Sequence, residues 1–236
     1  MIRPPSARPP GPLVGAVLML GLFALMAGHL MVAQPPVTQP LDDAWRAWVG
    51  ADAPVSGPLF WFFEQFGYGL GYTLLAGVSL ALLAGRRWWT LAFVLSAALL
   101  GPGLVSQGTK QLVDRPRPSP DPALGLHGPW VAVDHGSFPS GHALAMGFAV
   151  VAVGILLPVA HRRWWATASV LLCGGMVWQR TLVNAHWLSD AVFGVLAGVA
   201  ATIVVWWLLY DRVAIEQARG WRWVWRPGSA ESPPLS

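Results

Sequence analysis

The chain has 236 residues, of which 55% are hydrophobic and only 11% are charged, and its formal net charge is +4. Soluble domains have ~25% charged residues, so this composition excludes a water-soluble enzyme and indicates a single-domain integral membrane protein. The basic residues lie in short clusters between apolar runs and not in one long stripe, so the positive charge does not indicate a nucleic-acid partner.

Six apolar runs dominate the sequence, and each is close to the ~20 residues that a helix needs to cross ~30 Å of hydrocarbon. In chain order they cover residues 13–33, 66–85, 88–106, 142–160, 165–183 and 191–210. They predict an all-α fold, a six-helix transmembrane bundle that forms one membrane domain over residues 13–210. Residues 1–12 are predicted to be a cytoplasmic segment, and residues 211–236 a cytoplasmic tail that is partly disordered.

The first run has a second interpretation, a cleaved secretory signal with Arg3 and Arg8 as its basic segment. The run is longer than the ~7–15 apolar residues of such signals, which favours an uncleaved helix. The Pro-rich segment that follows, residues 34–61, is predicted to be an outer loop with a short amphipathic helix over residues 41–49.

The distribution of basic residues predicts how the bundle is oriented in the membrane. With the N-terminus in the cytoplasm, ten of the 15 basic residues fall on the cytoplasmic side and five on the other, as the positive-inside rule requires. Four of those five belong to the motifs described next. We therefore predict a multi-pass protein of the inner (plasma) membrane, with both termini in the cytoplasm. The motifs would then lie at the outer ends of helices 3–6, facing the periplasm or exterior.

The first motif is Lys110-Gln-Leu-Val-Asp-Arg115-Pro-Arg117-Pro118, which contains the only lysine of the chain. Lys110 and Arg117 are predicted to lie on a helix end and the loop after it, so that both cations can converge on one anion. Lysine supplies a point charge and arginine a planar fork, and both suit phosphoryl oxygens. The alternative is a basic lip that contacts lipid head groups, and Arg115 fits that role or a secondary contact with phosphate.

The second motif, Pro139-Ser140-Gly141-His142, directly precedes the fourth apolar run. The N-terminus of a helix presents unpaired N–H groups and a positive dipole end, which favour phosphate. Gly141 allows the backbone to approach an anion, and the Ser140 hydroxyl can cap the helix or donate to the ligand. His142 would lie in the first turn, where it can give a proton to a leaving oxygen. Taken alone, the motif is more typical of an ordinary serine cap beside a surface histidine.

The third motif runs from Arg180 through His186 to Asp190. A histidine and an aspartate four residues apart share a face of a helix and can form a hydrogen bond. A carboxylate that accepts from one imidazole nitrogen fixes the tautomer and leaves the other nitrogen free as a nucleophile or base. A histidine that is merely paired with a capping aspartate is an equally good interpretation of this pair in isolation.

Together the three motifs, Lys-x6-Arg-Pro, Pro-Ser-Gly-His and Arg-x5-His-x3-Asp, resemble those of the type 2 phosphatidic acid phosphatase superfamily. The six-helix layout extends the resemblance over most of the chain. One departure is visible, because the last motif of that family usually begins Ser-Arg and here it begins Gln179-Arg180. The substitution puts one secondary contact in question, and leaves the class of protein unchanged.

The resemblance implies a two-step phosphatase that needs no metal or other cofactor. His186 would attack phosphorus to give a phosphohistidine, Asp190 would orient it, and His142 would protonate the leaving oxygen and then activate water. The equatorial oxygens would be held by Lys110, Arg117, Ser140, Gly141 and Arg180. Outside the motifs, Glu64 is predicted to be an interfacial carboxylate, with contact to substrate as the alternative, and His127 and His135 are predicted to be solvated.

The implied partners are a lipid phosphate substrate and the bilayer, with the oligomeric state left open. Undecaprenyl diphosphate is the favoured substrate, because Arg115 would be a fourth cation free for a second phosphate. Phosphatidylglycerophosphate, phosphatidic acid and transfer of the phosphate to another lipid are alternatives within the same fold. A transporter or non-catalytic lipid-binding protein would place polar residues throughout the membrane depth or contain inverted repeats. The gathering of the polar residues on one side argues against it.

Overall fold

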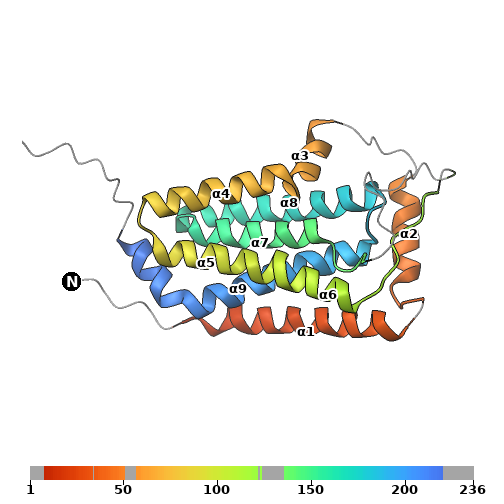
Figure 1. The fold of residues 1–236 in the computed structure, drawn as a ribbon, viewed down its shortest axis with the longest axis horizontal. Coiled ribbons are helices and arrows are strands. Elements are labelled where there is room, and N and C mark those ends of the chain that lie inside the picture. Colours follow the sequence, from red (N-terminus) through yellow and green to blue (C-terminus); the bar gives the residue numbers. More distant parts are fainter. Residues whose placement is uncertain (1–7, 34, 51–56, 122, 124–135, 220–236) are drawn as a thin grey trace, which may run out of the picture.

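The computed structural model describes residues 8–33, 35–50, 57–121, 123 and 136–219, and these form helices and connecting segments (Figure 1). The all-α prediction is confirmed. The two histidines predicted to be solvated, His127 and His135, lie outside the described residues. So do the first seven residues of the N-terminal segment and the last 17 of the tail.

Six long helices or helical units run side by side along the bundle (Figure 1). They are α1 (Pro10–Val32), α4 (Gly69–Ala84), α5 (Trp88–Ala98), α7 (Gly141–Leu156), α8 (Arg162–Leu182) and α9 (Leu188–Ala218), and each overlaps one of the predicted apolar runs. The helix α5 continues through a π-helical segment, η1 (Leu99–Val105), into α6 (Ser106–Leu112), which ends two residues after Lys110.

The chain is a multi-pass membrane protein by the length and hydropathy of these helices. Three of the described stretches are long and apolar enough to cross a bilayer: Pro10–Val32, Trp88–Leu112 and Leu188–Ala218. The bent pair α3 (Pro58–Phe66) and α4 counts as a fourth if it is one span, and α7 is a shorter apolar helix. The number of six spans therefore stays a prediction.

The segment before the second run differs in part from the sequence prediction. The amphipathic helix is confirmed as α2 (Gln39–Gly50), which lies across one end of the bundle (Figure 1). The remainder was predicted to be loop up to residue 61, but α3 already begins at Pro58, a residue favoured in the first turn of a helix. The chain then bends by 62° between α3 and α4. The prediction that one helix starts at Phe66 is thus wrong, since Phe66 ends α3.

Close packing of α7 against α9 brings the second and third motifs together. A Cβ atom added at Gly198 would lie 2.1 Å from the carbonyl oxygen of Leu144, and one at Gly147 would lie 2.4 Å from that of Val195. Small residues allow helix backbones to approach in a membrane, where burial of apolar surface provides no driving force between helices. Because α7 and α9 touch along their backbones, their N-terminal ends and the motif residues there are fixed relative to one another.

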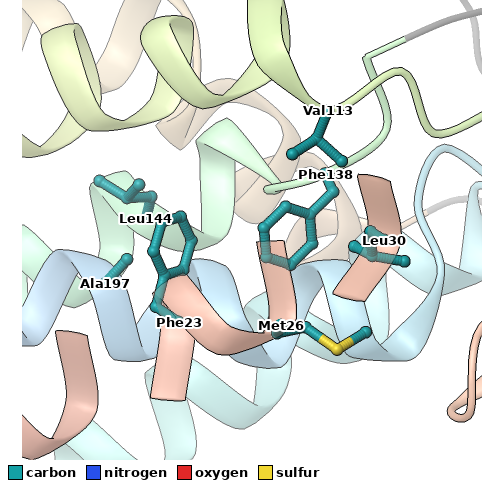
Figure 2. Packing of buried hydrophobic residues seen from close by; sticks show 7 residues of the cluster. All are labelled: Phe23, Met26, Leu30, Val113, Phe138, Leu144 and Ala197. Atoms are coloured by element: carbon teal, nitrogen blue, oxygen red, sulfur yellow. The ribbon is translucent and has the colours of Figure 1, made fainter. Parts of the chain in front are cut away.

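The helix α1 supports the turns that carry the first and second motifs (Figure 2). The ring of Phe23 stacks on that of Phe138 with their centroids 5.3 Å apart. The same buried cluster contains Val113, three residues after Lys110, while Phe138 lies two residues before Ser140. The remaining members are Met26, Leu30, Leu144 and Ala197. Both motif segments are therefore anchored to the bundle by apolar side chains next to the polar ones.

Candidate active site

One cavity of about 930 Å³ collects residues from all three motifs. Six of the residues predicted to form the site line it: Lys110, Arg117, Gly141, His142, Arg180 and His186. They come from α6, the loop after it, the start of α7, the end of α8 and the loop before α9. The structure thus brings together, around one cavity, residues that are up to 76 positions apart in the chain.

The imidazole of His186 is held by a main-chain group. Its Nδ1 atom lies 2.8 Å from the carbonyl oxygen of Ser137, and because a carbonyl only accepts, Nδ1 must carry the proton. This tautomer leaves the lone pair of Nε2 available as a nucleophile. Asp190 Oδ2 is farther away, 4.0 Å from Nδ1. The direct hydrogen bond predicted from the i,i+4 spacing is therefore not formed, because the carbonyl of Ser137 occupies its place.

Asp190 acts on His186 through the segment that carries this carbonyl. Its Oδ2 atom accepts a hydrogen bond from the Ser137 hydroxyl and another, at 3.0 Å, from the main-chain N–H of Trp187. Its main-chain oxygen accepts from the Ser140 N–H at 3.1 Å. Asp190 thus holds two main-chain segments in place: the one from Ser137 to Ser140, which carries the acceptor of His186, and Trp187, which follows His186 in the chain. Ser137 was missed by the sequence analysis, since a main-chain acceptor has no sequence signature.

Arg115 is placed differently from the sequence prediction. It is only 4% exposed, and its guanidinium lies between two fully buried carboxylates, donating from Nη1 to Asp190 and from Nη2 to Asp42 Oδ2 at 2.8 Å. It is not among the residues that line the cavity. The structure does not support a secondary phosphate contact for Arg115, because its donors are directed at carboxylates. Through Asp42, which also accepts from the Ser189 N–H at 2.8 Å, it ties α2 to the start of α9.

The electrostatics of the cavity favour an anion and a neutral nucleophile. Burial, followed by the positive charges of Lys110, Arg117 and Arg180, holds the pKa of His186 well below its usual value. The imidazole is therefore uncharged at neutral pH, as an attacking group must be. Burial also lowers the pKa of Arg117, and Asp190 and Tyr68 offset only part of this shift. A guanidinium remains charged under such a shift. Arg117 is fixed by a hydrogen bond of 3.0 Å from Nη1 to the carbonyl oxygen of Ala185.

The second motif forms the N-terminus of α7, as predicted. Ser140 caps this helix, with its Oγ atom 3.5 Å from the Ala143 N–H, and is fully buried. Gly141, not Ser140, lines the cavity, so the structure gives the serine a capping role and places the glycine where its backbone can approach an anion. His142, in the same turn, is partly buried and lines the cavity.

Glu64 and Gln179 form a buried network with Arg180 that the sequence analysis did not foresee. Glu64 Oε2 accepts from Gln179 Nε2 at 2.7 Å and pairs with Arg180 Nη2, while Gln179 Oε1 accepts from Arg180 Nε at 2.8 Å. Glu64 is 7% exposed and Gln179 is fully buried. The prediction of an interfacial Glu64 is wrong, because the break after α3 turns this end of the helix into the bundle.

The segment that contains the three motifs matches a protein-family model. The family model for the PAP2 superfamily matches residues 89–214, more than half of the chain. The chain belongs to the PAP2 superfamily. The resemblance stated from the motifs is thereby confirmed.

Two kinds of phosphatase are similar to this chain, one in sequence and one in fold. A stretch of 75 residues is 39% identical to phosphatidylglycerophosphatase B of Escherichia coli K12, and the same match is found with the Shigella flexneri protein. The match spans 30% of this chain and 28% of the length of that enzyme. The crystal structure of a transmembrane PAP2-type phosphatidylglycerolphosphate phosphatase from Bacillus subtilis has a similar fold, with a TM-score of 0.65. That likeness covers 81% of this chain and 94% of the other at 18% identity, so it concerns the fold alone.

The part of the chain that matches the PAP2 model contains all of the predicted site residues. Asp42 and Glu64, which pair with Arg115 and Arg180, lie outside it, on α2 and α3. The helices α2 and α3 of this PAP2 protein therefore supply the counter-ions of two arginines in the matched segment.

Proposed function

We propose that this PAP2 protein is a membrane lipid phosphatase that works through a phosphohistidine intermediate on His186. The observation that supports this most is the composition of the cavity described above. Its lining contains three cations, two histidines, the N-terminus of α7 and one carboxylate, that of Glu64, which is paired with Arg180. Three fixed cations and helix amides stabilise the charge of a transferring phosphoryl group, which is most of what catalysis of this reaction requires.

The rest of the cavity fits a lipid tail. Its walls continue along α7 as far as Leu156 and along the facing sides of α4 and α5. The lining residues there are apolar, among them Leu74, Leu75, Val78, Val94, Leu95, Phe148 and Val153. A substrate with a phosphate at one end and a long hydrocarbon chain would fill both parts.

In the proposed first step, Nε2 of His186 attacks phosphorus while the bond from phosphorus to the lipid oxygen breaks. His142 gives its proton to that oxygen, and the lipid alcohol leaves. In the second step His142 takes a proton from water, whose oxygen attacks the phosphohistidine. Inorganic phosphate and free His186 result. Lys110, Arg117, Arg180 and the N–H groups around Gly141 would hold the equatorial oxygens, with Ser140 acting as the cap of that turn.

For the substrate we propose a phosphomonoester such as phosphatidylglycerophosphate. The Escherichia coli and Bacillus subtilis proteins described above carry that name. The preference for undecaprenyl diphosphate depended on Arg115 as a free fourth cation, and the guanidinium of Arg115 is bound to Asp42 and Asp190. Three cations around one phosphate suit a monoester better than a diphosphate.

A panel of purified lipid phosphates in detergent tests the proposal. We expect phosphate release from phosphatidylglycerophosphate at a kcat/KM roughly tenfold above that for undecaprenyl diphosphate, a difference of ~1.4 kcal/mol. Release should persist in excess chelator, because the cations and amides supply the charge stabilisation, and vanadate should inhibit by occupying the phosphate site. Activity that is lost in chelator and restored by magnesium would contradict the mechanism. Label transferred to a second lipid and not to water would identify a phosphotransferase.

The proposed location is the inner membrane with the cavity mouth on the outer side, and cysteine labelling tests it. In a variant with Cys173 replaced by serine, a cysteine at residue 128, between the first and second motifs, should react with an impermeant thiol reagent in intact cells. A cysteine at His161, exposed between α7 and α8, should react only after the cells are permeabilised. The reverse pattern would place the site in the cytoplasm.

A further inference from the structure

We propose that the corner between α3 and α4, formed by Glu64, Gly67 and Tyr68, is a positioning element that holds both His142 and Arg180 for catalysis. This inference rests on the proposed function. The corner lies outside the segment that matches the PAP2 model, yet its contacts are with two residues of the motifs inside that segment.

The corner encloses the imidazole of His142 on three sides. The Nε2 atom lies 3.3 Å from the carbonyl oxygen of Glu64, and the ring of Tyr68 meets that of His142 edge-on, with centroids 4.7 Å apart and planes at 84°. A Cβ atom added at Gly67 would lie 1.9 Å from the ring of His142. Residue 67 must therefore be glycine if the imidazole is to keep this position. Because the carbonyl of Glu64 only accepts, Nε2 carries a proton, and this contact orients the ring. The proton that the proposed mechanism delivers to the leaving oxygen would then come from the other ring nitrogen, Nδ1, of the protonated imidazole.

The same corner supplies the counter-ion of Arg180 and orients its guanidinium. The side chains of Glu64, Gln179 and Arg180 form a closed ring in which each contacts the other two. Among the described residues, these contacts use two of the five N–H donors of the guanidinium, so three remain for phosphate oxygens. A buried guanidinium without a counter-ion would be costly, and the carboxylate of Glu64 offsets part of that cost while fixing the plane of the fork.

This ring gives a physical reason for the glutamine at the position where the family usually has serine. A serine at 179 has no side chain long enough to accept from Arg180 and donate to Glu64 at once. Gln179 and Glu64 therefore match each other, and one residue of the pair lies on α8 while the other lies on α3.

The two contacts of the corner serve different steps, and this makes them separable by the choice of substrate. A proton donor is needed when the leaving group is a poor one, such as the alkoxide of a lipid, and is hardly needed for p-nitrophenolate. Arg180 contacts phosphoryl oxygens, which gain charge whatever the leaving group is. Disturbing His142 should thus discriminate between the substrates, and disturbing Arg180 should not.

The first experiment compares Gly67→Ala with wild type on dioctanoyl phosphatidic acid and on p-nitrophenyl phosphate. We expect kcat on the lipid to fall by ~10²-fold or more and kcat on the aryl ester to fall by less than ~10-fold. The matched control is Gly77→Ala in the middle of α4, where an added Cβ meets nothing within 4 Å, and its activity should be unchanged. Equal losses of Gly67→Ala on both substrates, or no loss, would overturn the proposal.

The second experiment exchanges the partners of Arg180. Glu64→Gln should lower kcat by ~10-fold on both substrates, because Arg180 loses its orientation. Gln179→Glu should raise KM, because it adds a negative charge next to Arg180, which is proposed to bind the phosphate. The double variant restores one carboxylate and one amide to the ring, and we expect it to regain activity to within ~3-fold of wild type. A double variant no better than the worse single one would show that the ring does not position Arg180.

The wild-type rates separate the two proposals. If wild type releases phosphate from neither substrate, the proposed function fails. If wild type is active and the variants do not follow the pattern above, the phosphatase stands and the role of the corner is refuted.

Discussion

Replacing His186 with alanine is expected to remove turnover of every lipid phosphate, with a loss of roughly 10⁴–10⁶-fold in kcat. The imidazole Nε2 is the atom that would form the bond to phosphorus, and no other nucleophile from the three motifs is held in the same place. The Nδ1 contact with Ser137 fixes this geometry before substrate binds, since it requires no rearrangement of the ring. The low pKa of His186 keeps the imidazole neutral, so the wild type has the nucleophile ready at neutral pH.

The measurement is trapping of the phosphoenzyme. Wild type quenched during turnover of a ³²P-labelled lipid should retain an acid-labile, base-stable label, and His186→Ala should retain none. His161→Ala, an exposed histidine between α7 and α8, is the matched control and should behave like wild type. Turnover by His186→Ala at more than a few per cent of the wild-type rate would exclude His186 as the nucleophile.

Much of the candidate site was predictable from the sequence because the proposed chemistry restricts which residues can appear. Lys110 is the only lysine, and it opens a motif in an otherwise apolar chain, so it was visible without any knowledge of the fold. The cap at Ser140 was likewise predictable, since it depends on residues three positions apart. The helix bundle followed from the apolar runs, whose length is set by the thickness of the membrane.

The partners of those residues were not predictable, because the contacts join distant parts of the chain. Asp42 is 73 residues from Arg115, and Glu64 is 116 residues from Arg180. In the sequence Asp42 lies beside Asp43 in a short amphipathic helix, and Glu64 lies at the edge of an apolar run, and acidic residues in such places are typically solvated. Only the tertiary packing of α2 and α3 against the bundle turns them into buried counter-ions. The bend after α3 was missed for a related reason, since the apolar pattern continues across it.

The second large effect is expected at Arg115. Replacement by alanine leaves Asp42 and Asp190 buried without their shared cation, and breaking such a pair costs ~3–5 kcal/mol. We therefore expect a clear fall in the thermal unfolding temperature in detergent. Activity should fall as well, because Asp190 no longer holds the segment of Ser137 that orients His186. Arg46→Ala is a matched control on α2, where a partly exposed arginine contacts Asn184, and it should cost much less.

A second substitution tests whether the loss arises from unpaired charge. Asp42→Asn added to Arg115→Ala removes one of the two stranded carboxylates, so the double variant should be more stable than Arg115→Ala alone, with a coupling energy of ~1–3 kcal/mol. Because the defect lies in the scaffold of His186, the remaining activity should be reduced by the same factor on a lipid monophosphate and on a lipid diphosphate. A loss confined to the diphosphate, with unchanged stability, would show instead that Arg115 contacts a second phosphate. The proposed preference for a monoester would then be wrong, while the nucleophile and the three cations of the cavity would keep their roles.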